Sequence, residues 1–459
     1  MSIGTVTVEQ LRERAAAAQM ALMPELVARM HLDAAALRAL QQDRLRRLLA
    51  HASERSPFWA RRLRGIDAPR FALDQLGDLP PLTKTELMRE FDDAVTDRRL
   101  TRSLVERALA MTTNLPVPIL DGYIAQATGG SSGQRGVFVS DVDAYVETHT
   151  APARFLFSSE VARGLPPNGI RLATVAAATA VHSTGLAAAM SVPGSGPVLL
   201  HPVPVTLALA EMVTRLNAAR PHVLIGYPSM LARLAGERVA GRLTIEPRGV
   251  ATTSEMLTTE LRAAIRSGFG APIINLFGST EGLMGATEPD QCIFVFNSDT
   301  CLVELVDAED RPVPPGTPSA HILLTNLCNR VQPLIRYRLD DHFTRHPDAP
   351  GRGHLRATVE GRADDVLRYG GVQIHPLTVR AALLKHPEIL DYQVRQTETG
   401  IDVSLLADGI LDAPALTREL RNALAAAGLA APTVAVTRVD ELVRHAETGK
   451  LRRFVPLAG

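Results

Sequence analysis

An apolar run joins a polar end in the ten residues Ile273-Ile274-Asn275-Leu276-Phe277-Gly278-Ser279-Thr280-Glu281-Gly282. The first part predicts a buried strand, and the glycine, hydroxyls and carboxylate that follow predict a loop. In such a loop Phe277 can stack on a nucleobase, while Thr280 and Glu281 can contact a phosphate and its Mg²⁺. A strand followed by an ordinary polar turn explains this segment equally well when it is taken alone.

The surrounding chain alternates short apolar runs with helix-period segments. Strands are predicted at residues 171–175, 197–200, 223–226 and 273–277, and helices at residues 207–219, 229–240 and 259–267. This alternation predicts a layered α/β domain. Ahead of it, residues 1 to about 115 predict amphipathic helices, and residues 293–324 predict an antiparallel or barrel-like β-subdomain.

A smaller unit begins near residue 364. Its short helices and strands predict a lid-sized α+β domain, in which Leu416, Leu420 and Leu424 share one helix face. The fold class expected is therefore α/β, with a large N-terminal domain at residues 1–363 and a small C-terminal domain at residues 364–459. The large domain divides into a helical part at 1–115 and an α/β part with its β-subdomain at 116–363.

Composition excludes several classes of protein. The chain has 459 residues, with 49 Lys+Arg against 49 Asp+Glu, so no net charge favours binding to nucleic acid or to an anionic membrane. No signal peptide or membrane-spanning run is expected, and three cysteines cannot form a disulfide framework. We therefore expect a cytoplasmic protein that binds neither nucleic acid nor membrane.

A second polar loop lies ahead of the α/β segments. Residues 128–136 hold four glycines and three hydroxyls before the strand-like Val137-Phe138-Val139. Glycines let backbone N–H groups converge on an anion, and hydroxyls donate further hydrogen bonds, so the loop suits phosphate oxygens. An ordinary flexible turn is the alternative.

Three further segments bear chemistry late in the chain. Asp341 follows a strand and is a natural acceptor for ribose hydroxyls, although a solvated loop is the alternative. Residues 361–371 combine charged residues with glycines where the small domain begins, which indicates a linker. Lys450 is one of only three lysines in an Arg-dominated chain, and a compact ammonium differs chemically from a guanidinium. A terminal basic tail is the alternative for Lys450.

In this order and spacing the five segments resemble the adenylate-forming superfamily of acyl-CoA synthetases, peptide-synthetase adenylation domains and luciferases. The family phosphate loop Ser-Ser-Gly-Thr-Thr-Gly-Lys-Pro corresponds to residues 128–135, with Gln134-Arg135 replacing Lys-Pro. Tyr-Gly-Ser-Thr-Glu corresponds to 277–281, and Tyr-Arg-Thr-Gly-Asp to 337–341 with Leu339-Asp340 replacing Thr-Gly. The hinge motif Gly-Arg-x-Asp-Asp and the final Gly-Lys correspond to 361–365 and 449–450.

Within the superfamily the chain most resembles the phenylacetate–CoA ligase branch. The segments that carry this likeness are the helical N-terminus with residues 56–58 and 80–84, followed by 226–229, 333–338 and 371–376.

The resemblance assigns expected roles to individual residues. Lys450, Thr280 and Glu281 are expected to be catalytic, with Glu281 also holding Mg²⁺, and Asp364 is the expected hinge of a mobile lid. Gly370 and Gly371 are expected to close the CoA channel. The nucleotide-binding residues expected are Thr128, Gly130, Ser131, Ser132, Gly133, Phe277, Gly278, Ser279, Asp341 and Arg362. The acyl-pocket residues expected are His182, Tyr227, Ser254, Glu255, Asn275, Gly285 and Ala286.

The resemblance implies a two-step reaction. A carboxylate attacks the α-phosphate of ATP to give an acyl-adenylate and pyrophosphate, and CoA then displaces AMP. The small, mostly apolar pocket residues suit an aromatic or arylacetic acid. Two alternatives remain open: transfer of the acyl group to an amine or a carrier-protein thiol, and a non-catalytic nucleotide-binding relative.

The sequence also gives expectations about ligands, metal ions and oligomeric state. ATP, Mg²⁺ and CoA are expected, and a homodimer is left open. Some members of the branch hold a structural zinc, but no Cys-x-Cys partner accompanies Cys292 in this chain, so no zinc is expected.

Overall fold

The computed structural model describes residues 4–128, 135–158, 166, 169–191, 198–362, 365–383, 385–386, 388–407, 409–445 and 448–457. The expected phosphate-loop residues Gly130, Ser131, Ser132 and Gly133 and the expected hinge Asp364 lie outside these residues. Along the described part, no helix combines the length and the hydropathy that crossing a bilayer requires.

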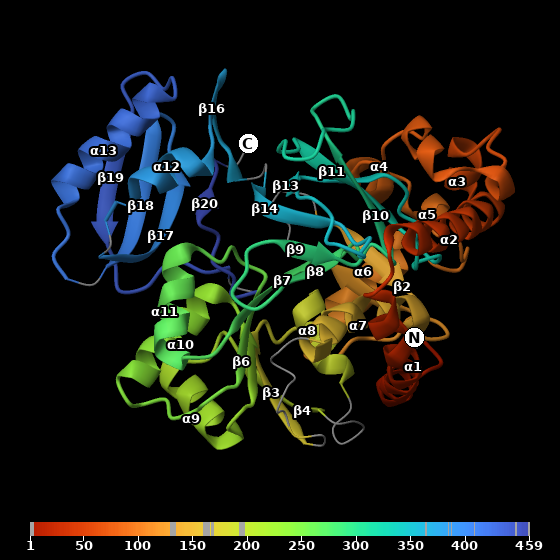
Figure 1. Cartoon of the computed structure of the whole chain (residues 1–459), viewed down its shortest axis with the longest axis horizontal. Coiled ribbons are helices and arrows are strands. Elements are labelled where there is room, and N and C mark those ends of the chain that lie inside the picture. The colour runs from red at the N-terminus through yellow and green to blue at the C-terminus, as the bar shows by residue number, and fades with distance from the viewer. Residues whose placement is uncertain are drawn as a thin grey trace.

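A nine-stranded sheet forms the centre of the large domain (Figure 1). Its first five strands in spatial order are parallel, and the later pairs are antiparallel. In that order the strands are β4 (Val198–Pro204), β3 (Ile170–Ala176), β5 (Val223–Gly226), β6 (Gly249–Thr253), β7 (Ile273–Gly278), β8 (Met284–Thr287), β9 (Phe294–Phe296), β14 (Arg356–Arg362) and β13 (Asp341–Arg345).

Helices cover both faces of the parallel part, as the α/β expectation required. One face packs against α9 (Leu209–Ala219), α10 (Pro228–Val239) and α11 (Thr259–Phe269), whose bounds agree with the predicted helices to within two residues. On the other side, α1 (Val8–Arg29), α7 (Val142–Ser158) and α8 (Ser183–Met190) share a separate apolar cluster.

Strand side chains alternate between the two faces, which is why both faces are apolar. Ile273 of β7 packs towards α10 and α11, whereas Ile274 and Leu276 pack on the opposite face. Strand β6 was not predicted, because Gly-Val-Ala-Thr-Thr lacks the large apolar residues that mark a buried strand. Its backbone nevertheless pairs with β5 and β7.

The N-terminal helices form a layer over two smaller sheets. The helices are α2 (Ala34–Arg55), α3 (Pro57–Arg62), α4 (Lys84–Arg89), α5 (Phe91–Ala94) and α6 (Arg102–Met111), with 3₁₀ turns at Ala68–Arg70 and Leu73–Asp78. The sheets are β1 (Ile124–Ala127) with β2 (Val137–Ser140), and β10 (Cys301–Val306) with β11 (His321–Asn326) and β12 (Tyr337–Leu339). The antiparallel form of the predicted β-subdomain is therefore present, while β9 joins the large sheet.

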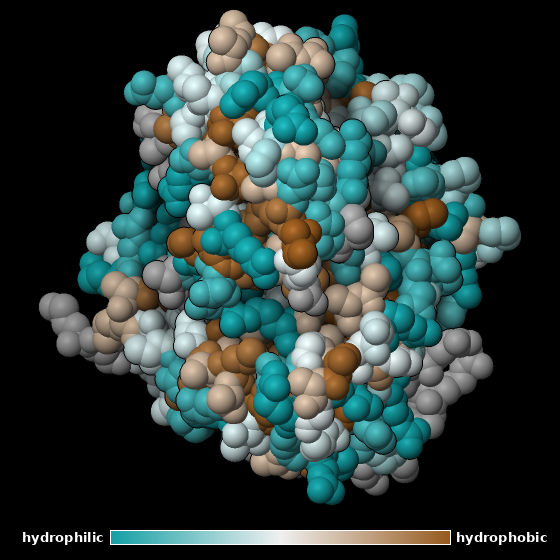
Figure 2. Space-filling model, turned by 90° about the vertical axis from the view of Figure 1, so that its left-hand side faces the viewer, coloured by the Kyte–Doolittle hydropathy of each residue, from teal (hydrophilic) through white to brown (hydrophobic). Residues whose placement is uncertain are grey.

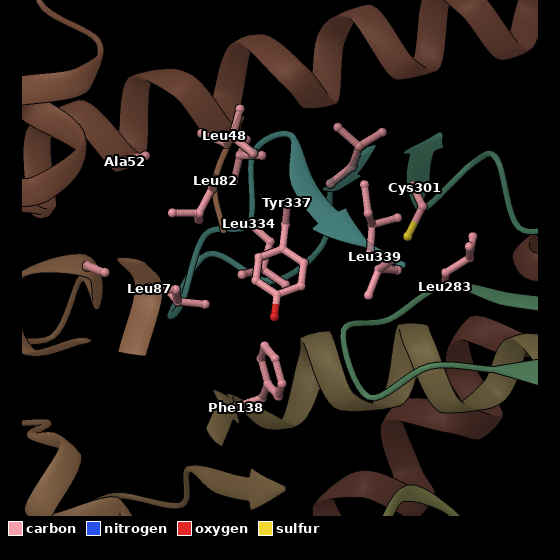
Figure 3. Close-up of a cluster of buried hydrophobic side chains, with 14 of the residues drawn as sticks. Leu48, Ala52, Leu82, Leu87, Phe138, Leu283, Cys301, Leu334, Tyr337 and Leu339 are labelled. Carbon is pink, nitrogen blue, oxygen red and sulfur yellow. The ribbon is translucent and has the colours of Figure 1, made fainter. Parts of the chain in front are cut away.

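Tyr337 lies at the centre of the core that joins these elements (Figure 3). Its side chain is fully buried, and its ring meets Phe138 edge-on at a centroid distance of 6.1 Å. Leu48 of α2 and Leu82 belong to the same cluster. The tyrosine of the 337–341 motif therefore anchors β12 in the core, two residues before the turn that leads to Asp341.

The C-terminal unit, called the lid below, has its own core and a four-stranded sheet in the order β19-β18-β17-β20. Leu416, Leu420 and Leu424 are buried on one face of α13, as predicted. The predicted boundary between residues 363 and 364 falls on residues outside the described part. The elements of the lid are β15 (Leu367–Tyr369), β16 (Val372–Ile374), α12 (Pro376–Leu383), β17 (Ile389–Gln396), β18 (Gly400–Ala407), α13 (Ala413–Ala426), β19 (Thr433–Arg438) and β20 (Phe454–Val455).

The lid lies above α10 and α11 at the left of Figure 1. Figure 2 looks onto this side of the molecule, where hydrophobic side chains form patches separated by hydrophilic ones. This face therefore gives no argument for a broad apolar docking surface.

A buried ion pair fastens α7 to the loop between β9 and β10. The Arg154 guanidinium donates to both carboxylate oxygens of Asp299, at 2.8 and 2.7 Å, and both side chains have no exposed area. Burial alone would raise the pKa of Asp299, but the hydrogen bonds and charge of Arg154 outweigh burial and lower it.

We predict that Arg154→Met lowers the free energy of unfolding by about 3–5 kcal/mol, because Asp299 loses its bidentate partner without access to water. The fluorescence of Trp59, the only tryptophan and a buried residue of the helical layer, reports unfolding in urea. Arg215→Met, which removes a half-exposed partner of Glu211, is the control and should cost less than about 0.5 kcal/mol. Equal costs for the two variants would contradict the prediction.

Candidate active site

The loops that follow the parallel strands meet at one edge of the sheet, because neighbouring parallel strands run in the same direction. Tyr227 follows β5, Ser254 follows β6, and the residues after Phe277 follow β7. In open α/β sheets ligands bind outside this edge. Ser254 takes a left-handed backbone conformation with φ of 68°, which is uncommon for a residue with a side chain.

Phe277 is half-buried in a group of aromatic rings. Its ring meets Phe296 and Phe343 edge-on at 5.5 Å and Phe294 at 6.3 Å. These contacts fix the ring plane, as offset and edge-on aromatic pairs do. Its stacking on a nucleobase stays a prediction, as does the nucleotide role of the exposed Gly278.

A tight turn carries Ser279, Thr280 and Glu281. The Gly282 N–H donates to the Ser279 carbonyl at 3.1 Å, and the Ser279 hydroxyl oxygen accepts from the Leu283 N–H at 3.2 Å. Gly282 has φ of 110°, and a Cβ there would lie 2.3 Å from Asn326 Nδ2, so only glycine fits. The Asn326 amide donates to the Glu281 carbonyl at 2.8 Å, which holds the buried Glu281 at the edge of the sheet.

A chain of polar side chains reaches Thr280 from behind. The Gln126 amide lies 3.1 Å from His149 Nε2 and 3.4 Å from the Ser183 hydroxyl, which is 3.5 Å from Thr280 Oγ1. Gln126, His149 and Thr280 line, with Glu281, a cavity of about 20 Å³, which is space for a single water.

His149 is neutral and has one tautomer. Its Nδ1 faces the Tyr145 carbonyl at 3.1 Å, so Nδ1 carries the proton and Nε2 accepts from the Gln126 amide. Its ring stacks on Tyr145 with centroids 4.3 Å apart. Burial lowers the pKa of His149 to about 4, against the opposing effect of the Tyr145 carbonyl. The chain behind Thr280 is therefore uncharged at neutral pH.

Thr128 closes the base of the expected phosphate loop. Its hydroxyl oxygen accepts from the Gly136 N–H at 2.8 Å, and its N–H donates to the Gly136 carbonyl at 2.9 Å. These two bonds bring together the chain on either side of the undescribed loop. Thr128 therefore joins the two described ends of this segment, and its own contact with a nucleotide stays a prediction.

Asp341 lies at the start of β13, where its backbone pairs with Arg362 of β14. Only 4% of Asp341 is exposed. The Asp340 carboxylate beside it accepts from Arg338 Nε at 3.1 Å, so the residue that replaces the family glycine forms an ion pair on the surface. The Arg362 side chain is not described, and the ribose role of Asp341 stays a prediction.

The lid turn that carries Lys450 lies against the large domain. The Tyr227 hydroxyl donates to the Thr448 carbonyl at 3.1 Å, and Glu255 Oε1 accepts from the Leu451 N–H at 2.7 Å. Within the turn, the Lys450 N–H donates to Thr448 Oγ1 at 3.3 Å. The structure thus brings Lys450 to the same edge of the sheet as the residues after β7.

The expected acyl-pocket residues divide into two groups. Tyr227 is fully buried and Glu255 contacts the lid, so the polar groups of both join the domains in this orientation, and their role in an acyl pocket stays a prediction. His182 precedes α8, where its Nδ1 donates to the Ala127 carbonyl of β1 at 3.0 Å. Two others lie on the large sheet: Asn275 of β7 accepts from Thr252, and Ala286 of β8 is buried beside Ile274. Gly285 leaves room for Phe296, since a Cβ there would lie 2.8 Å from that ring.

Gly370 and Gly371 form the tip of the hairpin between β15 and β16. Both are exposed, and Gly370 has φ of 58°, which the tight turn requires. Their expected role in a CoA channel stays a prediction.

Metal-binding clusters were sought throughout the described ranges. There, no group of three or more His, Cys, Asp or Glu side chains could hold a metal ion. Cys292 is exposed, while His354 contacts the carbonyl oxygens of Phe296 and Arg29 at 3.0 and 2.8 Å. The expectation of no structural zinc stays a prediction.

The chain is similar in sequence to known ligases. No family model matches the chain. A phenylacetate–coenzyme A ligase of Thermus thermophilus is 27% identical over 92% of this chain and 96% of its own length. A phenylacetate–coenzyme A ligase of Aromatoleum evansii is 24% identical over 77% of this chain and 76% of its own length. The resemblance to the phenylacetate–CoA ligase branch is confirmed.

Structural comparison agrees on the fold. A 2-hydroxyisobutyryl-CoA ligase, solved in a postadenylation state, superposes with a TM-score of 0.69 over 93% of this chain and 91% of its own, at 20% identity. The expected α/β class is therefore confirmed for this phenylacetate–CoA ligase-like chain, and at that identity the likeness shows the fold alone.

Sequence reasoning missed the residues behind and beside the site. Gln126 interrupts the otherwise apolar Ile124–Ala127 strand, which is a signal of a buried polar contact. Arg444 carries no such signal, because Ser229 and Glu255 lie about 200 residues away along the chain. The partner of His149 Nε2, Gln126, lies 23 residues away.

We predict that His149 makes the free energy of unfolding fall by about 2 kcal/mol between pH 7 and pH 5. The pKa of His149 is about 4 in the folded chain and 6.5 ordinarily. Between pH 6.5 and pH 4 the unfolded chain therefore binds a proton that the folded chain does not, so lowering the pH favours the unfolded chain. His149→Gln removes that proton and should show a shallower decline in urea titrations at the two pH values. Parallel declines in both proteins would contradict a neutral, buried His149.

Proposed function

We propose that this chain is an AMP-forming acid–CoA ligase. It activates a carboxylic acid with ATP to an acyl-adenylate and pyrophosphate, then transfers the acyl group to CoA. The observation that supports the proposal is the turn of Gly449 and Lys450, which is docked through Tyr227 and Glu255 on the sheet edge where β7 leads into the loop of Thr280 and Glu281, in a phenylacetate–CoA ligase-like chain.

The chemistry follows from charge. In the first step negative charge gathers on the α-phosphate as the carboxylate approaches, and the Lys450 ammonium is the preorganised cation for that charge. Glu281 and Thr280 offer a buried carboxylate and a hydroxyl, oxygen ligands of the kind that Mg²⁺ takes together with substrate phosphates. When bound there, Mg²⁺ would neutralise the leaving pyrophosphate.

We assign nucleotide binding to the residues that the family resemblance indicates. Thr128 and the undescribed loop after it would cradle the phosphates, Phe277 would stack on the base, and Asp341 with Arg362 would meet the ribose. The polar chain behind Thr280 would hold its hydroxyl in one direction, since every member of that chain is neutral.

The acid class proposed is aromatic or arylacetic. Two relatives are phenylacetate–coenzyme A ligases, and the residues expected at the acyl pocket are mostly small and apolar. Transfer to a carrier-protein thiol or an amine is the second candidate, because part of the chain is 30% identical to a probable non-canonical nonribosomal peptide synthetase of Salinispora arenicola.

Acid-dependent exchange of labelled pyrophosphate into ATP, across a panel of aromatic, arylacetic and aliphatic acids, tests the proposal directly. It reports the first step without knowledge of the acceptor. Exchange with aromatic or arylacetic acids supports the proposal, and absence of exchange with every acid would overturn it.

We predict that Lys450→Ala lowers pyrophosphate exchange by about 10²–10³-fold while sparing thioester formation from a supplied acyl-adenylate, because only the first step needs this cation. Lys385→Ala is the matched control, since Lys385 lies on the lid surface with 68% of its side chain exposed. An equal loss in both steps would instead indicate damage to the lid.

We predict that chelation of divalent ions abolishes exchange, that Mg²⁺ restores it, and that elemental analysis of the purified protein shows no stoichiometric zinc. One tightly held zinc per chain would contradict the last point. A cytoplasmic location stays a prediction from the sequence, and a homodimer stays an open possibility.

A further inference from the structure

Four residues from two regions of the large domain hold the lid turn. Tyr227 and Ser229 lie at the start of α10, and Glu255 and Met256 lie just after β6. Across from them the lid contributes Arg444, Thr448, Leu451 and Arg453. The partners are about 200 residues apart along the chain, so these contacts exist only when the lid is docked.

Glu255 is the centre of this contact. Its side chain is 1% exposed, and its two carboxylate oxygens accept from Leu451 N–H at 2.7 Å and from Ser229 N–H at 3.2 Å. The Ser229 N–H belongs to the first turn of α10, where the helix dipole favours negative charge. A buried carboxylate needs such donors, since it has lost its water.

Arg444 supplies the countercharge from the lid. Its Nη1 lies 3.5 Å from Glu255 Oε1 and donates to the Gly449 carbonyl at 3.0 Å, while its Nη2 donates to the Ser229 hydroxyl at 2.9 Å. One guanidinium therefore joins the helix, the carboxylate and the turn beside Lys450. A lysine could not span these three groups.

Gly449 fits closely against the large domain. It has φ of 64°, and a Cβ there would lie 2.2 Å from Val205 Cγ1. The turn can therefore approach β4 only because residue 449 lacks a side chain. The docked position is thus specified by shape as well as by charge.

We propose that Glu255 and Arg444 form a latch that positions Lys450 for acid activation and must open before acyl transfer. Glu255 is a positioning residue in this scheme, since it acts through the lid and not on substrate. The inference rests on the proposed function and deepens it. When the lid leaves, Glu255 loses Leu451 and Arg444 together and regains water, so the latch is made or broken as one unit.

The first experiment separates the two half-reactions. Glu255→Gln keeps the shape but removes the charge, and Arg444→Met removes the countercharge from the other side. Loss of charge-assisted hydrogen bonds should lower pyrophosphate exchange by about 10- to 100-fold in each variant. Thioester formation from supplied acyl-adenylate should stay within about threefold of wild type, and the double variant should lose little more than either single one.

Arg233→Met is the matched control. Arg233 also joins α10 to the lid, through Glu441 at 3.0 Å, but 31% and 65% of these side chains are exposed. Such exposed pairs contribute little, so exchange should fall by less than about fivefold. Equal losses for Arg233→Met and Glu255→Gln, or equal losses of both half-reactions in Glu255→Gln, would overturn the latch.

Hydrogen exchange gives a readout that does not depend on activity. In the wild-type chain the Leu451 amide donates to the buried Glu255 and should be protected. Glu255→Gln should speed its exchange about tenfold or more, while amides in the core of the lid sheet keep their rates. Unchanged Leu451 exchange would overturn the latch. If Leu451 responds as expected but wild type shows no acid-dependent pyrophosphate exchange, the latch stands and the proposed function is overturned.

Discussion

The parallel part of the large sheet fixes the positions of the loops that carry Tyr227, Glu255 and the Thr280 turn. Because β3, β5, β6 and β7 run in one direction, the residues that follow them reach the same edge. Tyr227, Glu255 and the turn of Thr280 thereby become neighbours, although dozens of residues separate them along the chain. The lid docks on this edge, so the geometry of the sheet determines both where substrates would bind and where Lys450 is delivered.

Two kinds of support hold this edge in place. Behind the Thr280 turn, the neutral side chains of His149, Gln126 and Ser183 form a polar chain. At the front, the lid is held by a charged contact whose members come from both domains. The two supports differ in a way that suits their tasks. A neutral chain buried among apolar residues can stay fixed, whereas a contact between charged groups at a domain junction can open and regain water.

The sequence predicted the alternating strands and helices well, because their apolar periods are local properties of the chain. It missed β6, whose Gly-Val-Ala-Thr-Thr has small residues and is a strand only because β5 and β7 flank it. Through motif order it linked the segments of Thr280 and Lys450, and their roles stay predictions. It assigned Glu255 and Tyr227 to the acyl pocket, whereas their polar groups contact Leu451 and Thr448 of the lid. Such contacts across about 200 residues leave no local pattern.

The central claim is that the lid occupies this docked orientation and leaves it between the two steps. Spin labels at Val239→Cys on α10 and Asn422→Cys on α13, both exposed, would report the distance between the domains by pulsed electron resonance. Cys292 and the partly exposed Cys328 would be replaced by serine, while Cys301 is buried, which raises the pKa of its thiol and protects it from labelling. The account predicts one short distance with ATP and acid, and a second, different distance when an acyl-adenylate analogue and CoA are added. A single distance under both conditions would contradict it.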